Sequence, residues 1–167
     1  MPTGFCRVTS KDEKLIVSTL STLPPRFGPS LTSPIHTLSE HDELVRSCKF
    51  SPDSSILATG DDSGIIYTWD VKTGRKLGRC DRHYSWVTYL HFSPDNKILV
   101  TVGENIRWWN IDGSRVQSFV IRGSYLRRSR TDHTFSTFVS IDSAGTLYIL
   151  SKLNRSEITE LPEVIYV

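Results

Sequence analysis

The sequence has 167 residues, a formal net charge of +2 at pH 7 and a hydrophobic fraction of 38%. This length fits one ordinary domain, and so small a net charge does not by itself favour a nucleic-acid-binding surface. No apolar run approaches the ~20 residues that a membrane-spanning helix requires, so we expect no membrane partner.

Cysteine usage and the N-terminal residues indicate a compartment. Cys6, Cys48 and Cys80 are an odd number without a CxxC spacing. They predict neither a disulfide framework nor a zinc site, so we expect reduced thiols and no metal or cofactor. The stretch MPTGFCRVTSKDEK lacks the apolar segment of a secretory signal, and we expect a cytoplasmic protein.

The first 34 residues differ in composition from the rest. They contain STLPPRFGPSLTSP, which is rich in proline and serine. Such a segment does not carry enough apolar side chains for a core. We therefore predict that residues 1–34 are a linker or a disordered lead-in.

A repeat of about forty residues organises the remainder. SCKFSPDSSILATG at residues 47–60 returns as YLHFSPDNKILVTV at residues 89–102, and FVSIDSAGTLYIL at residues 138–150 is a weaker third copy of LATGDDSGIIYTW. The first copy predicts four short strands, rich in β-branched and aromatic residues and separated by SPD, DDSG and KTG turns, at residues 45–50, 56–60, 65–70 and 76–80. Four antiparallel strands in each repeat form the blade of a β-propeller.

These repeats resemble WD repeats, in which His, Thr, Asp and Trp side chains form a hydrogen-bonded tetrad inside each blade. In the first copy His41, Thr59 and Trp69 match the tetrad, but Ser63 occupies the usual acid position, so we expect an incomplete tetrad. His83 and Trp109 repeat the pattern in the second copy, and we interpret all five as structural residues. The third copy lacks both the Trp and the acid.

Propellers have roughly four to eight blades, whereas this chain supplies about two and a half. We predict an all-β WD-repeat β-propeller fragment that is not a closed ring, and a truncated piece of a larger protein. Its predicted parts are a terminal strand at 35–38, blades at 44–80 and 87–120, a partial blade at 125–150, and a tail at 151–167, so that 35–150 form the propeller segment.

One face of the predicted blades carries candidate binding residues. Asp61 and Asp62 lie in the turn between the second and third strands, and Trp86 directly precedes the next blade. Alternating strand directions place these segments on the same face. An exposed Trp beside carboxylates suits a basic partner, because Trp packs on lysine stems and attracts ammonium groups. The alternative is that both acids only form the turn and Trp86 folds back onto the blade.

The resemblance extends to one kind of WD-repeat protein. VRSCKFSPDSSILATGDDSGIIYTWDVKTG, HYSWVTYLHFSPDNKILVTVGENIRWWNI and IDSAGTLYIL are similar to the C-terminal end of apoptotic protease-activating factor 1-type proteins. This resemblance implies a non-catalytic propeller that binds cytochrome c and restrains oligomerisation and caspase activation. By position, Trp86 and Asp62 match the contacts with the lysine-rich face of cytochrome c, and Asp61 matches them less closely.

Three other functions remain to be compared with this interpretation. A generic WD-repeat adaptor would use the same face for an unrelated partner. The stretch IRGSYLRRSR is a candidate nucleic-acid contact, which we interpret instead as a solvated strand face. The sequence has no HExxH motif, no GxSxG motif and no Gly-rich phosphate loop, so we expect neither an enzyme nor a nucleotide site.

Overall fold

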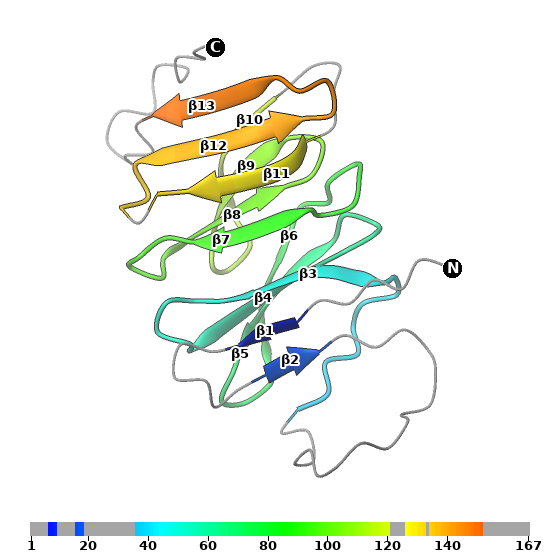
Figure 1. Ribbon diagram of the computed structural model, residues 1–167. Coiled ribbons are helices and arrows are strands. Elements are labelled where there is room, and N and C mark those ends of the chain that lie inside the picture. Colours follow the sequence, from blue (N-terminus) through cyan, green and yellow to red (C-terminus); the bar gives the residue numbers. More distant parts are fainter. Residues whose placement is uncertain (1–6, 10–15, 19–35, 121–125, 133, 152–167) are drawn as a thin grey trace.

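The computed structural model describes residues 7–9, 16–18, 36–120, 126–132 and 134–151. Within them the chain is all-β and forms two antiparallel sheets of four strands, one of three and one of two (Figure 1). Each larger sheet is one blade. Blade 1 is β3 (Val45–Phe50), β4 (Ile56–Asp61), β5 (Ile66–Asp70) and β6 (Lys76–Cys80); blade 2 is β7 (Tyr89–Phe92), β8 (Ile98–Val102), β9 (Ile106–Asn110) and β10 (Arg115–Phe119); blade 3 is β11 (Leu126–Thr131), β12 (Thr137–Asp142) and β13 (Leu147–Ser151).

The blades lie one above another in chain order, as Figure 1 shows. Inside each blade the strands pair with their chain neighbours, and the first strands β3, β7 and β11 contact one another from blade to blade. The sheets do not close into a ring. The predicted all-β propeller fragment is therefore confirmed. None of the described residues belongs to a helix long and apolar enough to cross a membrane.

The N-terminal region differs from the prediction. β1 (Arg7–Thr9) and β2 (Ile16–Ser18) pair antiparallel, and β1 contacts β3 of blade 1. The predicted linker therefore contains a short two-stranded sheet, and the rest of residues 1–34 lies outside the described residues. The predicted strand at 35–38 is wrong, because residues 36–38 are irregular. The predicted tail begins at residue 151, but Ser151 still belongs to β13, and residues 152–167 lie outside the described residues.

Cysteine chemistry also departs from the prediction. Cys48 on β3 is disulfide-bonded, so the expectation of three reduced thiols is wrong. Cys80 on β6 is a free thiol buried between blades 1 and 2. Burial, followed by the charges of Asp81 and Asp112, raises the pKa of the Cys80 thiol to about 12. A thiol in that state is a poor nucleophile near neutral pH, and it acts as a small apolar side chain.

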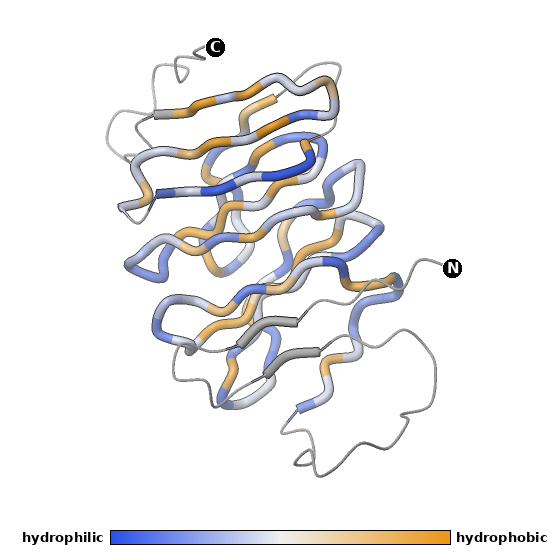
Figure 2. Tube along the Cα trace, in the orientation of Figure 1, coloured by the Kyte–Doolittle hydropathy of each residue, from blue (hydrophilic) through white to orange (hydrophobic). Residues whose placement is uncertain are grey.

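Apolar side chains between successive blades make the core, and Figure 2 shows hydrophobic segments running through the stacked strands. Ala58 and Ile66 of blade 1 pack against Val87, Leu90 and Leu99 of blade 2. The register-equivalent face of blade 2 packs in the same way against blade 3. This second cluster joins Val100, Val102, Ile106 and Trp108 to Leu126, Phe138 and Leu150.

Blade 3 repeats these positions on its other face. Val139, Ile141, Leu147 and Ile149 pair across β12 and β13 and alternate with Phe138 and Leu150, which face blade 2. Ile141 is 41% exposed, and the other three are half-buried. Among the described residues no further sheet covers this face, which is why the stack is open.

Within the described part of the chain, glycines in the hairpin turns also show that blade 1 is covered by a neighbouring blade and blade 3 is not. Gly64 in blade 1 and Gly145 in blade 3 have φ angles of 87° and 89°, a left-handed conformation that favours glycine. A Cβ on Gly64 would lie 2.2 Å from the carbonyl oxygen of His83, in the loop before blade 2. A Cβ on Gly145 would meet nothing within 4 Å. The turn of blade 1 is therefore pressed against its neighbour, whereas that of blade 3 is open.

We expect Gly64→Ala to destabilise the chain more than Gly145→Ala. Both substitutions carry the left-handed backbone penalty of about 1–2 kcal/mol, but only Gly64→Ala adds a clash with backbone of the next blade, which costs about 1–3 kcal/mol more. Urea unfolding followed by circular dichroism measures both variants. Equal losses of stability would contradict the contact between this turn and blade 2.

Candidate functional site

A series of buried hydrogen bonds holds the strands of blade 1 together. Trp69 Nε1 donates to the hydroxyl of Thr59 at 2.8 Å, and His41 Nε2 lies 2.7 Å from the same oxygen. His41 Nδ1 donates to a carboxylate oxygen of Asp61 at 2.7 Å, because a carboxylate can only accept. The tetrad is therefore complete, and the predicted absence of its acid at Ser63 is wrong.

Asp61 accordingly does not face a partner. Its carboxylate also accepts hydrogen bonds from the hydroxyl of Ser63 at 2.7 Å and the amide of Ile65 at 2.9 Å. The residue is 0% exposed. The prediction of Asp61 as a partner-binding residue is wrong, because β4 extends as far as this residue and turns its side chain into the blade. Burying a carboxylate requires such bonds, and here Ser63, Ile65 and His41 of the same chain supply them.

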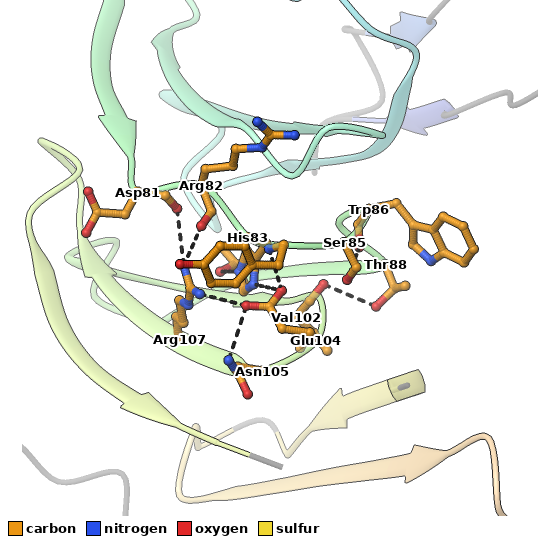
Figure 3. A network of polar contacts seen from close by, with 12 residues as sticks. Asp81, Arg82, His83, Ser85, Trp86, Thr88, Val102, Glu104, Asn105 and Arg107 are labelled. Atoms are coloured by element: carbon orange, nitrogen blue, oxygen red, sulfur yellow. Dashed lines mark hydrogen bonds and ion pairs between the residues drawn. The ribbon is translucent and has the colours of Figure 1, made fainter. Parts of the chain in front are cut away.

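Blade 2 contains the same series of hydrogen bonds with a different acid, and Figure 3 shows the part around His83 and Glu104. Trp109 Nε1 donates to Thr101 Oγ1 at 2.8 Å, and Thr101 Oγ1 lies 2.8 Å from His83 Nε2. His83 Nδ1 donates to Glu104 at 3.1 Å. Glu104 lies one position beyond the equivalent of Asp61, which is Gly103. The longer glutamate side chain therefore reaches back over the shortened turn.

Glu104 is held from several sides. It accepts from Arg107 at 2.6 Å and from the amide of Tyr84 at 2.9 Å, while Arg107 also donates to the carbonyl of Arg82 at 2.8 Å. Burial raises the pKa of Glu104, but the hydrogen bond and charge of His83, with the charge of Arg107, outweigh it and lower that pKa to about 2. Burial lowers the pKa of His83 and outweighs the opposing effect of its hydrogen bond to Glu104. The loop before blade 2 is thus tied to that blade.

The third copy keeps part of the pattern. Asp142 occupies the position of Asp61 and accepts from the amides of Ala144 at 2.9 Å and Thr146 at 2.8 Å and from the hydroxyl of Tyr148 at 3.0 Å. The predicted absence of the acid is therefore wrong, although the Trp position is Leu150. Ser140 replaces the central threonine and bonds Ser129 at 2.9 Å.

The predicted binding face lies at the junction of blades 1 and 2. Its turn is fastened to the next loop, because His83 donates its amide to Gly64 at 3.0 Å and Val87 donates to Asp61 at 3.2 Å. Trp86 is 53% exposed there, and Tyr84 is 90% exposed. Figure 3 shows the Trp86 ring pointing away from the network around Glu104. The alternative in which Trp86 folds back onto the blade is not what the structure has.

Arg46 joins the two predicted binding residues. Its guanidinium pairs with the carboxylate of Asp62 through two nitrogens, one of them at 3.0 Å, and lies 5.8 Å from the centre of the Trp86 ring. Asp62 and Trp86 therefore share one face, as the alternation of strands predicts. We call Arg46, Asp62 and Trp86 the Trp86 face.

Several members of these sites were missed from the sequence. Thr101 follows Thr59 by the same 42 positions that separate the two SPD turns, so the repeat offset identifies it. Arg46 carries no motif, and only the fold shows that it lies beside Trp86. No group of three or more His, Cys, Asp or Glu residues in the described part of the chain could hold a metal ion.

Comparison with known proteins agrees with this geometry. The family described as WD domain, G-beta repeat matches residues 32–70 and 74–110. Apoptotic protease-activating factor 1 of Homo sapiens is 42% identical over 132 residues, which cover 74% of this chain and 11% of that protein. Its Rattus norvegicus counterpart is 36% identical over 158 residues, covering 89% and 13%. The chain is a WD-repeat segment of the apoptotic protease-activating factor 1 type.

The WD-repeat segment also matches proteins of other names. Protein HIR1 of Yarrowia lipolytica is 35% identical over 153 residues, which cover 85% of the segment and 13% of that protein. The segment spans only about a tenth of the relatives that it matches. WD repeats are protein-interaction modules, and this coarse role applies to the segment.

Acid should weaken the WD-repeat segment through Glu104. Because its folded pKa of about 2 lies below the ordinary 4.5, the stabilisation is fully present above pH 4.5 and is lost as the pH falls toward 2. It amounts to at most about 3 kcal/mol. We expect Glu104→Gln to lower stability at pH 7 and to flatten its dependence on pH across that window.

Urea unfolding midpoints between pH 2 and pH 7 make this measurement. Glu43→Gln is the control, because Glu43 is exposed and no hydrogen bond or ion pair of the tetrads involves it. An unchanged pH profile in Glu104→Gln would contradict the role assigned to Glu104.

Proposed function

We propose that the chain is a non-catalytic, cytoplasmic segment of an apoptotic sensor whose Trp86 face binds cytochrome c or another basic protein. In the parent protein this propeller restrains oligomerisation and caspase activation until the partner docks. The observation that carries the proposal is an exposed tryptophan beside a carboxylate, held on one face by the junction of two blades. The likeness to apoptotic protease-activating factor 1 supports the choice of partner.

The internal contact of Arg46 supports a cationic partner. Its guanidinium takes the place that a lysine of the partner would occupy, on the Asp62 carboxylate and near the Trp86 ring. This contact places a cation beside both the acid and the ring. A lysine of the partner must therefore compete with Arg46. The segment binds the partner less tightly than it would if Arg46 did not contact Asp62 and Trp86.

The remaining blades of a parent propeller are a second proposed partner. The apolar positions of blade 3 match those that blades 1 and 2 bury against their neighbours. A further blade laid on Val139, Ile141, Leu147 and Ile149 would bury them in the same way. The open stack is thus suited to form part of a larger ring.

Trp86→Ala tests the binding face. We expect about tenfold weaker binding of cytochrome c, because the substitution removes the aromatic surface under the partner's lysine, a loss of about 1.4 kcal/mol. Asp62→Asn should weaken binding and reduce its salt dependence. Biolayer interferometry of the immobilised chain gives both affinities, and the same variants in a full-length parent should raise the cytochrome c concentration needed for caspase activation.

Leu77→Ala is the matched control, since Leu77 is an exposed apolar residue on the outer strand β6. It should leave binding unchanged. Equal affinities of the original chain and of both Trp86 face variants would remove the residue assignment. A face that binds an unrelated basic protein but not cytochrome c would indicate the generic WD-repeat adaptor instead.

Arg46→Ala should strengthen binding of a lysine-rich partner. It frees Asp62 and Trp86 and removes a repelling charge, and an exposed ion pair of this kind is worth up to about 1 kcal/mol, or about fivefold in affinity. Arg79→Ala is the control for the loss of one positive charge, because Arg79 is exposed on β6 away from this face. Weaker binding by Arg46→Ala than by Arg79→Ala would show that Arg46 contacts the partner rather than competing with it.

A further inference from the structure

The first strands of the three blades carry a row of basic side chains that the Trp86 face does not use. Lys49 on β3, His91 on β7 and Arg130 on β11 occupy the same register position. They pair with equivalent residues of the second strands, namely Lys49 with Ala58, His91 with Val100 and Arg130 with Val139. Because β3 contacts β7 and β7 contacts β11, we call these three residues the inner row (Figure 1).

Ring contacts join the inner row. The His91 ring stacks on Tyr89 at 5.9 Å and on Phe135 at 5.8 Å, with interplanar angles of 4° and 14°. The hydroxyl of Tyr89 lies 3.2 Å from His91 Nδ1. The Arg130 guanidinium lies 5.9 Å from the centre of the Tyr89 ring and donates to the carbonyl of Ser129 at 2.8 Å. Blades 2 and 3 thus hold two members of the row in place.

The row carries positive charge without a carboxylate. No ion pair joins Lys49 or Arg130 to an acid within the described ranges. Burial, and then the charge of Lys49, lowers the pKa of His91 to about 4, so its ring is uncharged near neutral pH. Arg127 and Arg128 are exposed on the same strand as Arg130. An anion placed at this edge would be attracted by each of these cations.

We propose that the inner row binds the carboxylates of an acidic peptide segment. Lys49 and Arg130 supply the charges. β7, which contacts the strands of both, carries Tyr89 and His91, and Phe135 stacks on the His91 ring. Arg130 is exposed and Lys49 is half-buried, so each contact with a carboxylate contributes a modest amount and binding depends on several carboxylates along one extended chain. The site lies on the first strands and is separate from the residues of the Trp86 face.

A peptide fits this edge better than single-stranded nucleic acid. Nucleic-acid grooves combine many phosphate contacts with aromatic faces on which bases stack. Here the rings stack on one another, and Arg130 covers the Tyr89 ring. Of the basic stretch IRGSYLRRSR only residues 126–130 lie within the described structure, and they add two arginines to Arg130 of the inner row.

Fluorescence anisotropy of a fluorescein-labelled hexaglutamate peptide, titrated with the full 167-residue chain at low salt, tests the proposal. We expect Lys49→Gln/Arg130→Gln to weaken binding about tenfold, because two charge contacts with the peptide are lost. Lys72→Gln/Arg75→Gln removes the same charge from the exposed turn before β6 and should change the affinity less than about twofold.

Lys49→Gln alone keeps the contact of Arg130 with Tyr89 and should weaken binding about threefold even if the double variant does not fold. Equal losses in the two double variants would show a nonspecific charge effect and overturn the proposal. Binding of hexaglutamine as tight as that of hexaglutamate would overturn it too. Tighter binding of an oligouridylate of the same charge would assign the inner row to nucleic acid.

Discussion

The hydroxyl of a buried threonine, bonded to both a histidine and a tryptophan, is the contact on which the rest of this chain depends. Thr59 and Thr101 each lie on the second strand of a blade, and each hydroxyl accepts a hydrogen bond from the indole N–H of a tryptophan on the third strand. Each also bonds a histidine from the segment that leads into its blade. One hydroxyl therefore links two neighbouring strands and the connecting loop. Since every partner is buried, loosening any one bond would leave a polar group unsatisfied.

That linkage also decides where the binding face lies. His83 belongs to the loop that carries Tyr84 and Trp86, and Glu104 accepts from both His83 and the Tyr84 amide. Because these hydrogen bonds fix its backbone, the loop exposes two aromatic rings to solvent instead of burying them. A loop that is already rigid loses less conformational entropy when a partner binds. The interior polar chain and the exposed face are thus parts of one arrangement.

The repeat offset predicted most of this fold, because strand alternation and turn chemistry are local properties. It also suffices to find Thr101 and Asp142, which keep the spacing of Thr59 and Asp61. The tetrad acid was expected at the position of Ser63 because the usual motif places it there. The structure has Asp61 instead, because β4 runs one residue beyond its predicted end and its last side chain points inward. Glu104 could not be found in this way, since a longer side chain compensates for a shorter turn.

The Trp86 face shows the other limit of sequence reasoning. Its position follows from the direction of the strands, but Arg46 enters through contacts between segments that no motif connects. The disulfide of Cys48 likewise depends on which segments meet in space, whereas the count of cysteines points away from it. Contacts of this kind are set by the packing of one blade on another.

The face of blade 3 bears on how propellers change in size during evolution. Ala58 and Ile66 of blade 1 and their equivalents Val100 and Ile106 of blade 2 pack against the next blade, and blade 3 keeps these positions as Val139 and Leu147. An interface built in this way packs against another blade with a matching apolar side. A gene duplication that adds a blade, or a deletion that removes one, therefore reuses the same apolar contacts between neighbours. The number of blades in a ring is then a matter of the angle between neighbours, to which many small packing differences contribute, and no single contact encodes it.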